Sequence, residues 1–284
     1  MPSPEPDPAP AIQVHAYSEH TVILRQNKSV NYEAPFLFLL FGNERALLLD
    51  TGASADPARF PLRETVDRLV ADWLERHPRS AYALLVAHTH GHGDHVAADG
   101  QFADRPFTTV VGTGLQEVTT AFGLADWPHR TGALDLGGRI LDLIPGPGHQ
   151  RAALVFHDRH TGLLLTGDSL YPGRLYIEDR TAYSATVDRL LDFCAAHPVR
   201  HVLGCHIETT RAAPRTSRTS RRSSSPRTTC APCAGPSTKR RTTTAPTPAG
   251  TSSSSTRTDR RPTPPGVRNR PRWWRGSIRS HSKV

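Results

Sequence analysis

Residues 86–100 read VAHTHGHGDHVAADG, and residues 88–95 within them bring four histidines and an aspartate close together, directly after an apolar run. The central part, HGHGDH at residues 90–95, fits the pattern H-x-H-x-D-H. Neutral imidazoles and a carboxylate suit Zn²⁺ or a similar borderline cation, and the glycines let the backbone bend so that neighbouring side chains converge. The alternative is a polar loop at the end of a buried strand. Four ligand-type residues within six positions favour a metal site over that loop.

Three further polar residues follow apolar runs later in the chain. His149 lies in the turn PGPGH, Asp168 follows LLLTG, and His206 follows VLGC. Loops at strand ends commonly carry functional side chains on a rigid sheet. We therefore expect these three residues to lie at one edge of the fold, together with the histidine-rich segment.

The N-terminal half shows the pattern of a sheet followed by a helix. Residues 11–26 and 34–52 contain short β-branched and apolar runs, with a hairpin turn at residues 42–44. Residues 61–78 have helical spacing, followed by strands within 81–90 and 107–112. The expected buried face of that helix comprises Leu62, Val66, Leu69, Val70, Trp73 and Leu74.

The C-terminal half repeats the alternation of strands and helix. Strands are expected within residues 137–149, on both sides of a turn at 158–162, and within 199–208. Residues 184–198 return to helical spacing. The expected buried side of that helix comprises Val187, Leu190, Leu191 and Cys194. Strands in groups with helices between them predict stacked sheets with outer helices.

The order of these motifs resembles the metallo-β-lactamase superfamily. An LLLDTG strand precedes HxHxDH, and then PGH, GD and a final strand-end histidine follow, over about Ile12 to Glu208. The resemblance implies an α/β fold, an αββα sandwich of two mixed sheets with outer helices. It also implies metals at one edge, between the two sheets.

Carried over by position, the resemblance implies two metal ions that share one bridging carboxylate. His90, His92 and His149 would hold one ion, Asp94, His95 and His206 would hold the other, and Asp168 would bridge them. The implied cofactor is two Zn²⁺ per chain, with iron or manganese as alternatives.

The implied reaction is attack of a metal-bridged hydroxide on an activated carbonyl. Asp94 would be the catalytic residue that orients the nucleophile and passes a proton to the leaving group. The implied substrate is a small thioester, lactone or similar ester, as in the glyoxalase II and lactonase branches.

Departures from the family pattern leave two other functions open. Val96-Ala97-Ala98 stands where many relatives have a Gly-Gly pair, and Gln150 stands where a small hydroxyl residue is common. His92 argues against the diiron flavoproteins, which usually have Glu there. A single-iron persulfide dioxygenase remains an alternative, and so does a nucleic-acid-binding protein or inactive homologue with a basic tail.

Residues near the motifs are candidates for supporting roles. Asp50 is expected to hydrogen-bond near the site and support a ligand, with a purely structural role as the alternative. His88 lies outside the ligand pattern, and we expect it at the strand end or behind the ligands. Tyr171 and Tyr176, just beyond Asp168, are candidate substrate-orienting hydroxyls.

Two cysteines and one short segment have a simpler structural interpretation. Cys205 is expected in the core, because side chains alternate along a strand and its neighbour His206 faces the site. Cys194 is expected in the core of its helix. NYEAPF, residues 31–36, interrupts the N-terminal sheet, and a connecting turn is favoured over a segment that lines the pocket.

The composition changes abruptly after Glu208. The net charge of +9 combines −8 for residues 1–208 with +17 for residues 209–284. Arg, Ser, Thr and Pro supply 54 of the 76 residues of this tail, which is too polar to offset the entropy of ordering it. We expect a flexible lead-in over 1–11, the metallo-β-lactamase-like domain over 12–208, and a disordered tail over 209–284.

Three origins are consistent with the tail: a nucleic-acid-binding extension, a neutral appendage, or a GC-rich gene read out of frame. The abrupt change in composition favours the third, so nucleic acid is expected only as a non-specific partner of residues 209–284. The lone CAPC at 230–233 is not expected to bind zinc.

The cellular compartment is inferred from what the sequence contains. Its four cysteines do not suggest a disulfide framework, and neither a secretory signal nor a membrane span is apparent. We expect a cytoplasmic protein that does not associate with membranes.

Overall fold

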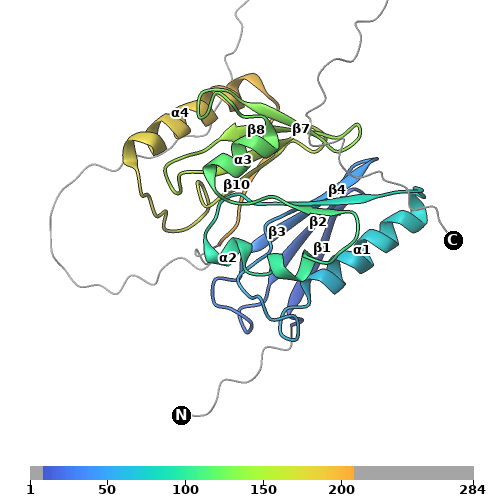
Figure 1. Cartoon of the computed structure of the whole chain (residues 1–284). Coiled ribbons are helices and arrows are strands. Elements are labelled where there is room, and N and C mark those ends of the chain that lie inside the picture. Colours follow the sequence, from blue (N-terminus) through green and yellow to red (C-terminus); the bar gives the residue numbers. More distant parts are fainter. Residues whose placement is uncertain (1–8, 208–284) are drawn as a thin grey trace, which may run out of the picture. The chain divides into compact units, whose positions relative to one another are not determined.

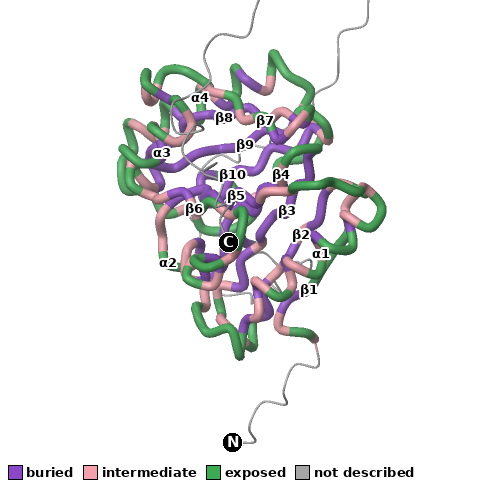
Figure 2. Tube along the Cα trace, turned by 45° about the vertical axis from the view of Figure 1, so that its right-hand side comes forward, coloured by how far each residue is buried: buried purple, intermediate pink, exposed green. Residues whose placement is uncertain are grey.

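Residues 9–207 of the 284-residue chain are described by the computed structural model, and they form two facing sheets with helices outside them (Figure 1). The expected lead-in and tail lie largely outside the described residues. Figure 2 shows that the buried residues follow the strands of both sheets. Within the described range, no helix is long and apolar enough to cross a membrane.

The first sheet has six strands in sequence order, β1-β2-β3-β4-β5-β6. They are β1 (Ile12–Ser18), β2 (Thr21–Gln26), β3 (Phe36–Phe41), β4 (Arg45–Leu49), β5 (Ala83–Ala87) and β6 (Thr108–Val110). β1 to β4 pair antiparallel, whereas β5 and β6 join in parallel. The turn expected at 42–44 connects β3 to β4, with Phe38 opposite Leu49.

The second sheet has five strands in the order β11-β10-β9-β8-β7. They are β7 (Gly132–Asp135), β8 (Ile140–Pro145), β9 (Leu154–Asp158), β10 (Leu163–Gly167) and β11 (His201–Gly204). β7 to β10 pair antiparallel, and β11 joins β10 in parallel. Strands β8, β10 and β11 therefore all run in the same direction.

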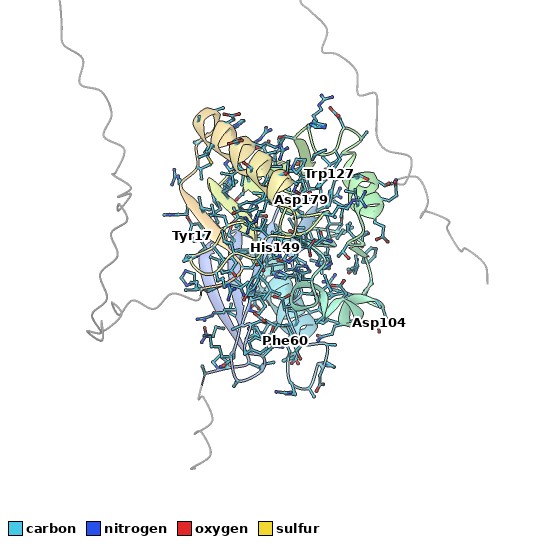
Figure 3. All side chains as sticks on the ribbon, turned by 90° about the vertical axis from the view of Figure 1, so that its left-hand side faces the viewer. Tyr17, Phe60, Asp104, Trp127, His149 and Asp179 are labelled. Carbon is cyan, nitrogen blue, oxygen red and sulfur yellow. The ribbon has the colours of Figure 1, made fainter. Side chains whose placement is uncertain are left out.

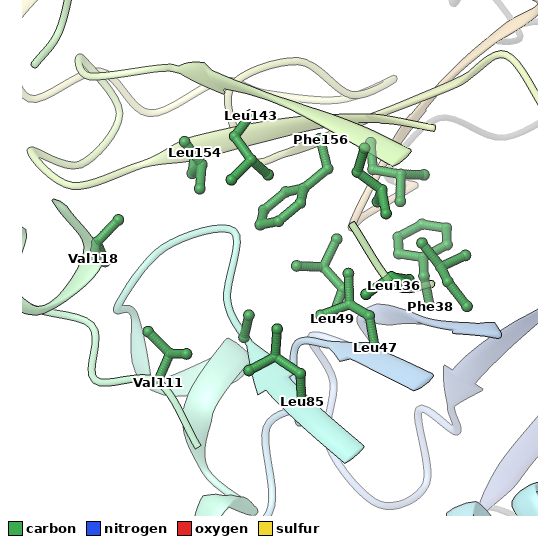
Figure 4. Close-up of a cluster of buried hydrophobic side chains, with 14 of the residues drawn as sticks. Phe38, Leu47, Leu49, Leu85, Val111, Val118, Leu136, Leu143, Leu154 and Phe156 are labelled. Carbon is green, nitrogen blue, oxygen red and sulfur yellow. The ribbon is translucent and has the colours of Figure 1, made fainter. Parts of the chain in front are cut away.

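Alternation along the strands divides the apolar residues between two layers. In β4, Leu47 and Leu49 point into the core between the sheets, whereas Ala46 and Leu48 point toward the outer layer. Figure 4 shows Leu47 and Leu49 facing Phe156 of the second sheet. Successive strand side chains point to opposite faces, so sheets covered on both faces need the nearly continuous apolar runs seen in this sequence.

Helix α1 (Leu62–Arg76) covers the outer face of the first sheet, as the sequence predicted. Its buried residues are Leu62, Val66, Val70 and Trp73, whereas Leu69 and Leu74 are partly buried. Trp73 stacks on Phe41 with ring centroids 5.1 Å apart. The shorter helices are α2 (Gly93–Val96), α3 (Leu115–Phe122) and the 3-10 helix η1 (Asp99–Phe102).

Helix α4 (Arg180–Ala196) covers the second sheet and corrects one prediction. It begins four residues before the expected segment, because Asp179 caps it by accepting hydrogen bonds from two backbone N–H groups. Its buried residues are Thr186, Leu190 and Phe193, whereas Leu191 is 64% exposed. Val187 is also exposed, at 36%. The buried face of α4 is therefore narrower than expected, and the prediction that Val187 and Leu191 are buried was wrong.

Helix, sheet, sheet and helix thus stack as four layers. This arrangement confirms the predicted fold class, an αββα sandwich of two mixed sheets.

Candidate metal centre

The candidate ligands follow the carboxyl ends of strands in both sheets. Because β8, β10 and β11 run in the same direction, the turns after them meet at one edge, and these turns carry His149, Asp168 and His206. The segment with His90 follows β5 of the other sheet. In Figure 3, His149 lies between α4 above and the blue strands of the first sheet below.

All seven residues predicted as ligands fall into two groups. One group is His90, His92 and His149, and the other is Asp94, His95, Asp168 and His206. Within each group, one potential ligand atom per residue lies within 4.8 Å of the others.

The first group brings three imidazole nitrogens together. His90 Nε2 lies 3.0 Å from His92 Nδ1, and His149 Nε2 lies 3.1 and 3.0 Å from these two atoms. In a tetrahedral site with Zn–N bonds of about 2.0–2.1 Å, two ligand nitrogens lie roughly 3.3 Å apart. The three nitrogens are therefore spaced as ligands of one small cation.

In His90 and His149, hydrogen bonds to Nδ1, the ring nitrogen opposite the ligand atom, fix the tautomer. His149 Nδ1 donates to the Tyr176 carbonyl at 2.7 Å. The Thr89 hydroxyl donates its proton to Asp50. It lies 3.1 Å from His90 Nδ1 and therefore accepts a hydrogen bond from the imidazole N–H. His90 Nε2 and His149 Nε2 are each left with a free lone pair, the form that binds a metal.

The second group combines two carboxylates with two imidazoles. Asp94 Oδ2 lies 3.2 Å from His95 Nε2 and 3.1 Å from His206 Nε2, and Asp168 Oδ1 lies 3.6 and 3.4 Å from the same nitrogens. Among the described residues, the buried atoms His95 Nε2 and Asp168 Oδ1 have no hydrogen-bond partner. Buried polar atoms rarely lack partners, and a cation would satisfy both.

The two groups differ in charge. Burial lowers the pKa of His90 well below its ordinary value, and it also lowers the pKa of His149. In the second group burial opposes charge, but the carboxylates of Asp168 and Asp94 outweigh it and raise the pKa of His206 to about 10. His90 and His149 are therefore held neutral, whereas the second group holds carboxylates paired with protonated rings when no metal is bound.

Asp50 links the two groups through hydrogen bonds. It is fully buried and accepts hydrogen bonds from the Thr89 backbone N–H at 2.7 Å, the Thr89 hydroxyl at 2.9 Å and His95 Nδ1 at 3.0 Å. Its backbone has a positive φ of 66°, at the turn where β4 ends. Asp50 thus contacts His95 directly and reaches His90 through Thr89.

The structure places His88 and Cys205 behind the candidate ligands. His88 is buried and belongs to neither group, and its Nε2 lies 3.2 Å from Asp99 Oδ2. Cys205 lies in the core between the sheets, as expected, but its thiol also donates to Asp50 Oδ2 at 3.3 Å. Side-chain alternation gave no sign of that contact.

A cavity of about 560 Å³ opens over the second group. Its lining residues are Arg25, Lys28, Tyr32, Glu33, Ala34, His92, Asp94, His149, Asp168, Tyr171, Tyr176, His206 and Ile207. The prediction of a plain connecting turn at 31–36 was wrong, because residues 32–34 form part of this wall and the Glu33 carbonyl accepts from His206 Nδ1 at 3.1 Å. The break in the apolar run was the available signal.

The two candidate tyrosines line this cavity in different ways. The Tyr171 ring packs edge-on against His206 with centroids 5.5 Å apart, and its hydroxyl donates to the Arg174 carbonyl. Tyr176 is 58% exposed, and its backbone carbonyl holds His149. A substrate-orienting role stays a prediction for both hydroxyls.

A third cluster of potential ligands, Glu19, His20 and His77, is less suited to a metal. Trp73 Nε1 donates to His20 Nδ1 at 3.0 Å, so neutral His20 carries its proton on Nε2. That nitrogen is the one that faces Glu19. Its protonation argues against a metal site in this cluster.

Comparisons with known proteins agree with this arrangement. The chain is 30% identical over 143 residues to a hydroxyacylglutathione hydrolase of Rhizobium meliloti (strain 1021), covering 49% of this chain and 54% of that protein. It is 27% identical over 210 residues to the acyl-coenzyme A thioesterase MBLAC2 of Bos taurus, covering 61% and 73%. It is 26% identical to a hydroxyacylglutathione hydrolase of Nostoc punctiforme, covering 49% and 51%. The chain thus spans about half the length of the two hydroxyacylglutathione hydrolases it matches.

A solved metallo-beta-lactamase from Pontibacter korlensis has the same fold, with a TM-score of 0.50 at 18% identity, over 69% of this chain and 91% of that one. The family model of the metallo-beta-lactamase superfamily matches residues 34–206, which include all seven candidate ligands. Because this match covers more than half of the chain, the protein belongs to the metallo-beta-lactamase superfamily.

Proposed function

We propose that this protein is a metal-dependent hydrolase of thioesters or of related activated esters such as lactones. The observation that carries the proposal is the convergence of seven ligand-type side chains into two adjoining groups at the base of one cavity. The relatives named hydroxyacylglutathione hydrolase and acyl-coenzyme A thioesterase support a thioester as substrate.

Two zinc ions are the proposed cofactors, with iron or manganese as alternatives. His90, His92 and His149 would hold one ion, and Asp94, His95 and His206 would hold the other, with Asp168 shared between them. The donor set of imidazoles and carboxylates suits these metals. When bound, such ions supply an activated water nucleophile and stabilise negative charge on a carbonyl oxygen.

The protein's own residues would orient the reactants and move the proton. Asp94 faces the cavity, with its carboxylate between His95 and His206, and this placement suits it to orient the nucleophile and pass a proton to the leaving group. Thr89 and Asp50 hold the imidazoles in fixed tautomers. Rigid support of this kind keeps the reacting groups in place without reorganisation during the reaction.

The test combines metal analysis with a panel of thioesters, lactones, β-lactams and phosphodiesters. We expect about two metal ions per chain and hydrolysis of a thioester or lactone. His92→Ala should abolish that hydrolysis while the protein stays folded, since His92 lies at the cavity surface. His129→Ala, at an exposed histidine far along the chain from every candidate ligand, is the matched control.

Two results would contradict the proposal. Unchanged turnover in His92→Ala would remove the metal groups from the reaction. One iron per chain without hydrolysis of any ester would instead favour the persulfide dioxygenase alternative.

A further inference from the structure

Arg25 is a cation in the cavity wall with no carboxylate partner among the described residues. It lies in β2 opposite Phe36 of β3, and its guanidinium carbon is 5.1 Å from the centre of the Phe36 ring. Its Nε is buried without a hydrogen-bond partner, and no carboxylate in the described range lies within ion-pair distance of its guanidinium. This contact with Phe36 holds the side chain at the cavity without satisfying its charge.

Four other arginines of the described chain have carboxylate partners. Arg139 and Arg159 each form a bidentate pair with an aspartate, through Asp158 and Asp142 respectively. Arg63 and Arg105 also contact carboxylates. A partly buried guanidinium that lacks such a partner is energetically unfavourable, which points to a partner supplied from outside the chain.

The surroundings indicate the chemistry of that partner. Lys28 adds a second, exposed cation to the same wall, and Glu33, the acidic residue nearby in sequence, forms no ion pair with Arg25. A guanidinium offers parallel N–H donors that match the two oxygens of a carboxylate. Arg25 and the candidate ligands line one cavity of about 560 Å³, so a single small molecule can contact both.

We propose that Arg25 binds a carboxylate of the substrate and so selects acidic esters over neutral ones. This inference rests on the proposed function, since it names the class of ester that the same site takes. The carboxylate can belong to the acyl part or to the thiol part of a thioester. Both positions present the same chemistry to Arg25.

The experiment uses the full chain with bound metal and two pairs of thioesters. In the acyl pair, N-acetylcysteamine carries a 4-carboxybutanoyl group or its neutral carbamoyl counterpart. In the thiol pair, an acetyl group is carried by 3-mercaptopropionate or by its amide. The variants are Arg25→Gln and Arg25→Lys, and the matched control is Arg68→Gln, which removes an exposed arginine of α1.

We expect the wild type to prefer the carboxylate over the amide by about 10- to 100-fold in kcat/KM, in at least one pair. Arg25→Gln should remove that preference, mainly by raising KM for the acidic ester much more than KM for the neutral ester. Arg25→Lys should retain part of the preference for the acidic ester, because lysine keeps the positive charge but lacks the paired N–H donors of the planar guanidinium. Arg68→Gln should behave as the wild type.

Equal turnover of acid and amide by the wild type in both pairs would overturn the inference. An equal loss of kcat/KM for the acid and the amide in Arg25→Gln would also overturn the inference, because that result indicates a structural role for Arg25.

Calorimetric binding of the corresponding non-hydrolysable thioethers separates this inference from the proposed function. If no ester is hydrolysed, the proposed function fails, but tighter binding of the acidic thioether that is lost in Arg25→Gln still supports carboxylate recognition. Equal binding of acidic and neutral thioethers refutes it.

Discussion

At the scale of single residues, Asp50 has more contacts with the candidate metal centre than its place in the sequence suggests. It is fully buried, yet Thr89, His95 and Cys205 all donate to its carboxylate. An imidazole that donates to a carboxylate is a stronger and better oriented ligand than a free one. One side chain thus orients His95 directly and His90 through Thr89.

Asp50→Asn tests this role. The amide keeps the size of the side chain but loses acceptor capacity, so His95 and Thr89 cannot both donate as they do now. We expect metal affinity to fall by about 10- to 100-fold, which is typical when such a partner is removed. Competition with a chromophoric chelator measures the affinity.

The control for this prediction is Asp188→Asn at an exposed position of α4. If Asp50→Asn binds metal as tightly as the wild type, the role of Asp50 is purely structural.

At the scale of elements, the register of α4 decides which leucine stabilises the protein. Leu190 packs against Val155 and Leu164 of the second sheet, whereas its neighbour Leu191 is 64% exposed. Neighbouring helix positions point about 100° apart, so adjacent leucines need not share a burial class.

The two alanine variants of these leucines are matched controls for each other. Leu190→Ala should lower the free energy of unfolding by about 2–5 kcal/mol, because it leaves a cavity. Leu191→Ala should change it by less than about 0.5 kcal/mol. Urea denaturation measures both, and similar losses would contradict the observed register.

Arg139 joins the two sheets at the opposite end of β8 from His149. Its guanidinium donates to Asp158 of β9 at 2.6 and 3.1 Å and to the Thr21 hydroxyl of β2 at 2.7 Å. It also donates to the backbone carbonyls of His20 and Phe41. One buried cation therefore holds strands of both sheets together.

Removing one member of this buried pair should be costly. Arg139→Met leaves the Asp158 carboxylate buried without its cation, and we expect a loss of about 3–5 kcal/mol in unfolding free energy. The double variant Arg139→Met/Asp158→Leu should recover much of that loss, because it removes the uncompensated charge. A double variant no more stable than Arg139→Met would show that the cost lies elsewhere.

The same pair predicts how stability depends on pH. Burial raises the pKa of Asp158, but the hydrogen bonds and charge of Arg139 outweigh it, and the folded-state pKa lies below the ordinary value. The stabilisation is therefore complete above the unfolded pKa of about 3.9 and is lost as pH falls through the lower folded pKa. Urea unfolding between pH 7 and 3 should show a smaller acid-induced loss in Asp158→Asn than in the wild type. Identical pH profiles would refute this contribution.

At the scale of the whole molecule, the candidate metal centre joins segments that are far apart in sequence. Its seven residues follow β5, β8, β10 and β11, and so come from both sheets. A metal that binds only the folded state stabilises it by mass action, by about 4 kcal/mol at a free concentration 1,000 times the Kd of one site.

Metal removal should therefore lower Tm. We expect dialysis against a chelator to lower it by several degrees and zinc to restore it, as measured by circular dichroism. His149→Ala should show a smaller shift because one group loses a ligand, whereas His129→Ala should match the wild type. A Tm independent of metal would argue against metal binding by the folded chain.

The tail over 209–284 lies outside the described residues, and its expected origin stays a prediction. The coding DNA can test whether an out-of-frame reading explains the change in composition. If neither alternative frame after codon 208 encodes a leucine-rich segment with helical spacing, the out-of-frame explanation fails.

The sequence by itself determined the layers of the fold and the identities of the candidate ligands. Strand alternation and helical spacing depend on neighbouring residues, so most strands, α1 and the position of α4 could be predicted locally. The short elements β7 and α3 were not predicted. The histidine-rich segment and the strand-end residues His149, Asp168 and His206 carried their own chemical signal.

Only the tertiary structure decided which distant groups meet. The exposure of Leu191 depends on the sheet beneath α4, and the contact of Cys205 with Asp50 depends on how β11 packs against the first sheet. Arg25 and residues 32–34 line the same cavity as His149 and His206, which lie far later in the chain. The physical reason is that local pattern fixes which way a side chain points, whereas the partner it meets is set by packing between segments far apart in the chain.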